Sequence, residues 1–294
     1  MRKILKWVGI IVGVVIALVV VAALVVGLNG YVKLTNSQAY KFTQSFTAPT
    51  SAAAVARGQY LVNSVVGCFG CHGQGGKGAI FINAQPIGLL VAPNLTRGQG
   101  GVGGQMTDAD WNRAIRHGLG HDGRVLMIMP ADNFAHLSDA DFGAVVAYIK
   151  SLPPVDNVLP GRQLAPAAYL LVGAGLFPLP AQEIDHTATP VASVTPAETA
   201  DYGEYIVTLA DCASCHGPKF TGGTPGQGTP VGPNIAPSGE VGGWTQAQFI
   251  NTIRNGTTPS GETLSTEMPW MTFRNMTDQD LGAVYDYLHS LPSQ

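Results

Sequence analysis

Two short stretches of the chain combine residue types that bind or react with metal centres. Residues 65–73 read VVGCFGCHG and residues 209–217 read LADCASCHG, and together they hold all four cysteines of the 294-residue chain. In each stretch, two cysteines separated by two residues are followed directly by a histidine. The residues concerned are Cys68, Cys71 and His72 in the first stretch, and Cys212, Cys215 and His216 in the second.

Three kinds of site suit this spacing. Covalent haem attachment needs two thiols that add to the two vinyl groups of one porphyrin and an adjacent histidine that reaches the iron. A four-cysteine zinc site would use both pairs, but it would leave both histidines without a role and would close a very long loop. A thioredoxin-like redox motif should follow a strand in a βαβ unit, and no such pattern appears. The sequence favours two covalently bound haem c groups over these alternatives.

The two motifs belong to an internal repeat. VAPNL in the first copy parallels VGPNI in the second, and TDADWNRAIRHG parallels TQAQFINTIRNG. MPADNFAHLSDADFGAVVAYIKSLP likewise parallels MPWMTFRNMTDQDLGAVYDYLHSLP at a constant offset. This similarity predicts two duplicated domains, residues 52–155 and 198–294.

A haem iron bound by one histidine takes a second axial ligand, and methionine in that position raises the reduction potential. Met127 and Met129 are candidates in the first copy, and Met268, Met271 and Met276 in the second. Only Met129 and Met268 occupy equivalent positions, and each precedes a proline, which suits an irregular loop. We predict that these two ligate iron, whereas methionine elsewhere fills gaps in the core.

Two further pairs of equivalent residues are candidates for supporting roles. Pro93 and Pro233 offer a carbonyl that can accept the second N–H of a ligating imidazole, although proline is also common in ordinary turns. Arg116 and Arg254 suit a bidentate grip on a haem propionate. A cation that favours a helix C-terminus is the alternative interpretation of both arginines.

Helical patterns dominate both copies. Ser138 and Thr277 each precede an aspartate by three residues, which predicts the start of a helix that ends at SLP. Thr195 is the expected N-cap of the helix before the second motif. No alternating run is long enough for a sheet, so the predicted fold class is all-α. Histidines 117, 121, 136 and 289 have no counterpart and are expected at the surface. His186 is a candidate for an additional ligand, but a lone histidine in a linker more often has a structural role.

The N-terminus predicts a membrane anchor. Three basic residues precede a run from Trp7 to Leu28 that carries no charge, and 22 helical residues cross a bilayer core of about 30 Å. A cleaved signal peptide would have a shorter apolar region and a small-residue cleavage site. Basic residues before the span predict a single-pass protein of the cytoplasmic (inner) membrane, with its haem domains on the periplasmic side. We assign residues 1–31 to the anchor and 32–51 to a stalk.

Residues 156–197 form a proline-rich linker between the copies. Ala165 to Gln182 carries no charge, but prolines divide it into pieces too short to cross a membrane. A short apolar helix packed against a haem domain is the expected structure. The net charge of −3 and the lack of a basic stripe argue against nucleic acid as a partner.

Taken together, these motifs resemble class I c-type cytochromes in both copies. The stretch GRVLMIMPADNFAHLSDADFGAVVAYIKSLPPV is especially similar to the cytochrome subunits of membrane-bound alcohol and gluconate dehydrogenases. Those subunits have three haem domains, whereas this chain has two and an N-terminal anchor. The layout also resembles the two-haem subunit of some terminal oxidases. The resemblance implies redox partner proteins, either an integral membrane complex or a soluble carrier.

Two functions remain in view. The first is an electron-transfer protein in which histidine and methionine close both irons, with no catalytic residue of its own. The second is a dihaem enzyme of the peroxidase or thiosulfate dehydrogenase type. A peroxidase needs an iron that opens, and thiosulfate dehydrogenases of this layout use a cysteine ligand. Every cysteine here is committed to a haem attachment motif, so the sequence favours the electron-transfer protein.

Overall fold

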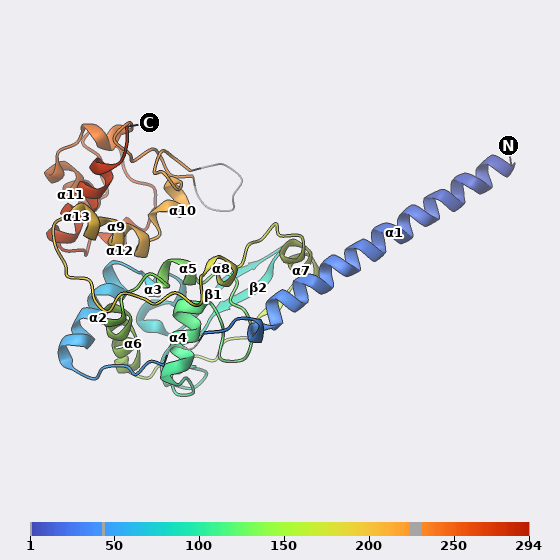
Figure 1. The fold of residues 1–294 in the computed structure, drawn as a ribbon, viewed down its shortest axis with the longest axis horizontal. Coiled ribbons are helices and arrows are strands. Elements are labelled where there is room, and N and C mark those ends of the chain that lie inside the picture. The colour runs from blue at the N-terminus through green and yellow to red at the C-terminus, as the bar shows by residue number, and fades with distance from the viewer. Residues whose placement is uncertain (1, 43–44, 224–230, 294) are drawn as a thin grey trace.

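The computed structural model describes residues 2–42, 45–223 and 231–293. A long N-terminal helix projects from a helical body in which the second copy packs against the first (Figure 1). The α-helices in these ranges are α1 (Arg2–Thr35), α2 (Ala52–Ser64), α3 (Cys68–His72), α4 (Asp108–His117), α5 (Ala131–Phe134), α6 (Asp139–Ser151), α7 (Pro166–Gly173), α8 (Pro180–Glu183), α9 (Ala200–Leu209), α10 (Cys212–His216), α11 (Gln246–Asn255), α12 (Trp270–Phe273) and α13 (Asp278–Ser290).

Helix α1 contains the predicted anchor. An 18-residue window within it reaches a mean hydropathy of 3.3, and none of that window is buried. The helix is long and apolar enough to cross a membrane. It continues past the predicted boundary at residue 31, and Leu34 near its end is fully buried in the body. Helix α1 is therefore continuous with a segment that packs into the first domain.

The two copies fold into corresponding helices. Thr107 and Thr245 begin α4 and α11 with capping boxes, and both helices end at a glycine with positive φ, Gly118 (64°) and Gly256 (69°). Ser138 and Thr277 cap α6 and α13 as predicted. These helices confirm the predominantly helical fold.

Two details of the secondary-structure prediction are wrong. Helix α9 begins at Ala200 and is capped by Thr199, so Thr195 is not the N-cap. A small antiparallel sheet is also present in the first copy, in the order β1 (Ala79–Ala84), β2 (Gly88–Ala92), β3 (Gln163–Leu164). Its strands are short and lack alternation of polar and apolar residues, and β3 comes from the linker. The pairing of β2 with β3 is therefore long-range, and no local sequence pattern predicts the sheet.

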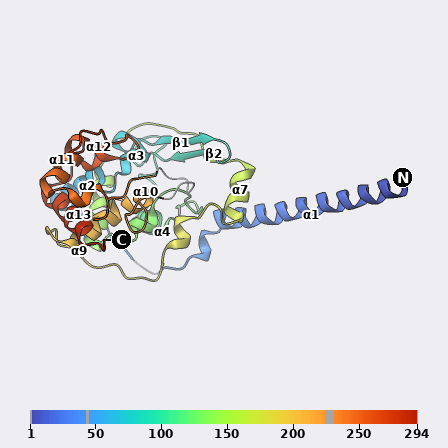
Figure 2. The same ribbon diagram turned by 90° about the horizontal axis from the view of Figure 1, so that it is seen from above.

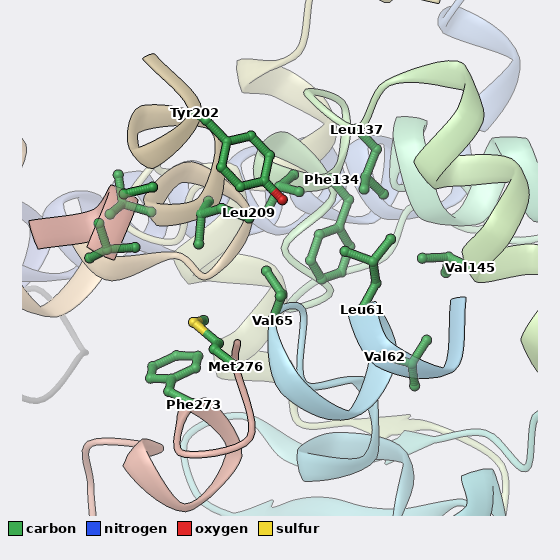
Figure 3. Close-up of a cluster of buried hydrophobic side chains, with 14 of the residues drawn as sticks. Leu61, Val62, Val65, Phe134, Leu137, Val145, Tyr202, Leu209, Phe273 and Met276 are labelled. Carbon is green, nitrogen blue, oxygen red and sulfur yellow. The ribbon is translucent and has the colours of Figure 1, made fainter. Parts of the chain in front are cut away.

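The two domains share a continuous apolar core. Figure 3 shows Val65, which directly follows α2, between Leu61 of α2 and Leu209, Phe273 and Met276 of the second copy. All five side chains are at least nine-tenths buried. Because this interface is apolar and enclosed, the domains pack as one body rather than as two units on a tether.

Reciprocal hydrogen bonds surround this shared core. The Tyr205 hydroxyl lies 2.9 Å from Asp141 Oδ2 and accepts the backbone N–H of Ser138 at 3.1 Å. In the opposite direction, the Tyr60 hydroxyl donates to Asp280 and accepts the N–H of Thr277 at 3.0 Å. Each tyrosine thus binds the first turn of the last helix in the other domain, which gives the interface a pseudo-twofold arrangement.

We expect Tyr60→Phe to lower the free energy of unfolding by about 1–3 kcal/mol, because it removes a donor from a buried carboxylate. Asp280 is 2% exposed. Tyr205→Phe should cost less, since Asp141 keeps its ion pair with Arg57 at 2.8 Å. Denaturant titration in detergent would measure both changes. Tyr148→Phe is the control, because it removes only a 3.4 Å contact with Asn63 inside the first domain. Equal effects of Tyr60→Phe and Tyr148→Phe would contradict the prediction.

The linker contributes a buried contact of its own. His117 is 4% exposed, and its Nδ1 lies 2.9 Å from Nδ1 of His186. The ring of Phe42 stacks on His117 with centroids 4.0 Å apart. The expected surface position of His117 is therefore wrong, because linker and stalk residues cover it. His186 has the structural role expected for it, as the linker partner of His117.

Candidate haem-binding sites

Both cysteine motifs fold into a single helical turn. The residue before the first cysteine has left-handed backbone in each copy, Gly67 with φ of 60° and Asp211 with φ of 55°. In α3 and α10 the two cysteines stand at i and i+3, on one face of the turn, with the histidine next. All four cysteines are free of disulfide bonds. Within the described ranges, no three His, Cys, Asp or Glu side chains gather as a metal cluster.

Each motif histidine is held by a proline carbonyl. Nδ1 of His72 lies 2.9 Å from the carbonyl oxygen of Pro93, and Nδ1 of His216 lies 2.8 Å from that of Pro233. A carbonyl only accepts, so Nδ1 carries the proton and Nε2 keeps a free lone pair. Burial lowers the pKa of both imidazoles, which favours the neutral form that ligates metal. The geometry is therefore that of an oriented metal ligand.

The first motif opens onto an apolar cavity of about 340 Å³. Cys68, Cys71, His72, Pro93 and Met129 all line it. The structure thus brings together five of the residues that the sequence singled out in the first copy, although they span more than sixty positions of the chain.

The two methionine loops have matching backbones. The carbonyl of Met129 accepts the N–H of Ala131 at 2.7 Å, and that of Met268 accepts the N–H of Trp270 at 2.8 Å. The prolines that follow have φ near −76° and −78°. Met268 is partly buried against the shared core. Met127 also lines the first cavity, but it packs in a separate apolar cluster with Leu34 and Leu90.

The cavity walls also fit the charge of a haem group. Trp111 lines the cavity, and its buried Nε1 has no hydrogen-bond partner among the residues that the structure describes. Arg124 and Arg162 line it as well. Burial lowers the pKa of Arg162, and the neighbouring charge of Arg124 lowers it further. Asp122 also lines the cavity and forms an ion pair with Arg124. The Arg162 cation and the Trp111 N–H beside an apolar space suit an apolar macrocycle with carboxylate substituents, which is the chemistry of haem.

Sequence reasoning missed the cavity residues Trp111, Arg124 and Arg162, of which Arg162 was the hardest to foresee. It lies in the linker, immediately before β3, and has no equivalent in the repeat. The comparison of the two copies drew attention to Arg116 and Arg254 instead. Only a tertiary contact reveals Arg162, because the linker folds back over the first domain.

Arg116 and Arg254 each form an ion pair with an aspartate in the first turn of the last helix of their copy. Arg116 is 3% exposed and does not line the cavity, and its guanidinium bonds Asp139 at 2.8 Å and the Leu137 carbonyl at 2.7 Å. Arg254 bonds the equivalent Asp278 at 2.6 Å. Each arginine therefore ties the end of one helix to the start of the last helix of its copy. The structure does not bring Arg116 into contact with the residues of the haem motif.

Comparison with known proteins agrees with this geometry. The family model described as Cytochrome c matches residues 55–153 and again residues 200–292. The chain belongs to the cytochrome c family. Both copies are thus cytochrome c domains, and the family to which they belong carries covalently bound haem c.

Similar proteins include redox subunits. The chain is 28% identical to the fructose dehydrogenase cytochrome subunit of Gluconobacter japonicus, over 84% of this chain and 55% of that protein. It is 26% identical to the cytochrome c subunit of the quinone-type alcohol dehydrogenase of Gluconacetobacter polyoxogenes, over 84% and 58%. A dihaem c-type cytochrome of Cereibacter sphaeroides is 25% identical, over 77% and 82%. The chain spans little more than half the length of the two dehydrogenase subunits.

Proposed function

We propose that this chain is a membrane-anchored dihaem cytochrome that transfers electrons on the periplasmic side of the cytoplasmic membrane. The observation that carries the proposal is the duplicated site, a motif histidine oriented by a proline carbonyl together with a methionine on an equivalent Met-Pro loop. Bound haem c would supply an iron that alternates between two oxidation states.

The side chains divide the work of holding each haem. The cysteine pairs would form the thioether bonds, His72 and His216 would each provide a nitrogen ligand to iron, and Met129 and Met268 would each provide a sulfur ligand. In the first domain, Arg162 and Trp111 would bind propionates, a role supported by their positions in the cavity lining. With a histidine and a methionine both bound to each iron, neither iron would offer a site to a substrate, which favours electron transfer over catalysis.

The partner that we propose is a dehydrogenase, with this chain as its electron-transfer subunit. Support comes from the relatives, which are named as cytochrome subunits of fructose and alcohol dehydrogenases. The N-terminal helix α1 would hold the complex at the membrane, where a second redox partner accepts the electrons. Purification of the chain from native membranes in mild detergent should recover a flavin- or quinone-dependent dehydrogenase subunit. Recovery of the chain alone would mean a mobile carrier.

Carbon monoxide separates the proposed carrier from a dihaem enzyme. The full chain, purified in detergent and reduced, should carry two haems by intact mass and show almost no shift of its Soret band under carbon monoxide, because methionine closes each iron. Met129→Ala supplies the positive control, since it opens one position. A shift corresponding to half of the haem in the unsubstituted chain would favour an enzyme with one open iron.

A further inference from the structure

The linker helix α7 lies directly against the membrane-spanning helix. A Cβ atom at Gly30 would overlap the carbonyl of Tyr169, and one at Gly173 would overlap the carbonyl of Val26. The Asn29 side chain donates to the Gly173 carbonyl at 2.9 Å. Figures 1 and 2 both show α7 beside the body-proximal end of α1. Backbone contact of this kind fixes the position of α7 along α1, because neither helix can slide without a clash.

The contact reaches into the apolar part of α1. Val26 contacts α7 at Gly173, and a Cβ at Gly27 would lie 3.6 Å from Cδ2 of Leu170. Both residues belong to the apolar run from Trp7 to Leu28, which ends before the polar residue Asn29. That run matches the thickness of a bilayer core at ~1.5 Å per residue, so its last residues lie at the boundary of the hydrocarbon. Helix α7 must then lie at the same depth.

The outward surface of α7 and its following turn is apolar. Leu170 is 37% exposed and Leu176 is 74% exposed. No charged residue occurs between Arg162 and Glu183. The rings of Tyr31 and Tyr169 lie together, with centroids 6.1 Å apart. Tyrosines beside an apolar surface are typical of the layer where lipid headgroups meet acyl chains.

The inner side of α7 is bound to the first domain. Val172 is 1% exposed and packs in the cluster that contains Leu34 and Leu90. The backbone N–H of Val125 donates to the carbonyl of Leu34 at 3.0 Å. Strand β3 and Arg162, which lines the haem cavity, immediately precede α7. A force on α7 would therefore be transmitted to the wall of that cavity.

We infer that α7 and the turn through Leu176 form a second membrane contact, an interfacial helix that lies in the headgroup layer of the outer leaflet. Its ligand is the phospholipid bilayer. This inference rests on the proposed membrane anchoring of α1, because depth is measured along that helix. The interfacial helix fixes the tilt and rotation of the first domain, so that its haem cavity keeps one orientation toward membrane-embedded partners.

Thiol accessibility tests the inference in the full chain. Leu170→Cys and Leu176→Cys would be placed in phospholipid vesicles and treated with a charged, water-soluble maleimide. Val191→Cys, 57% exposed in the linker, is the control in water, and Leu18→Cys, 64% exposed on α1, is the control in lipid. Because a thiol in the apolar layer resists ionisation, we expect Leu170→Cys and Leu176→Cys to react more than about tenfold more slowly than Val191→Cys.

The outcomes are distinct. Reaction of Leu176→Cys and Leu170→Cys as fast as Val191→Cys, with Leu18→Cys protected, would overturn the interfacial helix and leave the anchor intact. Fast reaction at Leu18→Cys as well would overturn the anchor and the interfacial helix together. A photoreactive residue at position 176 in native membranes should form an adduct with phospholipid. An adduct with another protein subunit at that position would overturn the assignment of lipid as the ligand.

Discussion

Met129→Ala is expected to lower the reduction potential of one haem sharply and to abolish half of the sulfur-to-iron absorption of the oxidised protein. Met268→Ala should do the same for the other haem. A methionine ligand raises the reduction potential of a histidine-ligated c-type haem, and axial ligands as a group tune haem potentials over about 0.8 V. Loss of one sulfur ligand should therefore change the reduction potential by more than a change in packing alone would. Redox titration of each variant, followed by visible spectroscopy, measures the change.

The control for the first site is Met127→Ala. Met127 is 4% exposed and lines the same cavity, so its truncation should cost about 2–5 kcal/mol of stability. It should leave the sulfur-to-iron band and both potentials nearly unchanged. The control for the second site is Met271→Ala, at a side chain that is 55% exposed. Loss of the band in either control would show that the ligand had been assigned to the wrong methionine.

Gly58→Ala and Gly203→Ala are expected to prevent stable folding of the domain that each occupies. A Cβ at Gly58 would overlap the carbonyl oxygen of Ala144, and one at Gly203 would overlap that of Ala283. These overlaps lie where α2 crosses α6 and where α9 crosses α13, and neither backbone can yield as a side chain would. We expect a loss at or above the upper end of the roughly 1–3 kcal/mol typical of overpacking, seen as a lower yield of haem-loaded domain.

The intrinsic helix propensities of alanine and glycine predict the opposite effect on stability. Alanine favours a helix over glycine by about 0.5–1 kcal/mol, so a substitution judged by propensity alone would stabilise α2 and α9. Gly70→Ala is the matched control, because a Cβ there meets nothing within 4 Å and the second copy has Ser214 in its place. Denaturant titration should show Gly70→Ala to be neutral or slightly stabilising. Equal tolerance of alanine at positions 58 and 70 would mean that the helices cross less closely than described.

The chemistry of this chain could be predicted from its sequence because that chemistry is local. Two thiols and an imidazole must fall within one helical turn to bind one porphyrin, so five consecutive residues are enough to identify the motif. Helix caps are equally local, and Ser138 and Thr277 begin their helices as expected. The repeat added a comparison between copies, which selected Met129 and Met268 among neighbouring methionines. That assignment stays a prediction.

Contacts between distant segments could not be read in this way. Asp141 and Asp280 look like cap residues in the sequence, but in the fold their carboxylates bind tyrosine hydroxyls of the opposite domain. Arg162 lines the haem cavity although it lies in the linker. Nothing within a few residues of these side chains specifies their partners, because the partners lie 64 and 220 positions away in the case of the two aspartates.

The linker helix α7 shows the same difference between what the local sequence predicts and what long-range contacts decide. Its sequence showed an apolar segment too short to span a membrane, and we expected it to pack on a haem domain. Only the fold brings Gly173 against Val26 and Gly30 of α1. The hydrophobic effect favours burial of an apolar surface, but it is non-directional and does not specify which other surface covers it. That choice depends on backbone shape, since two glycines allow these two helices to meet, and shape of this kind exists only in the folded chain.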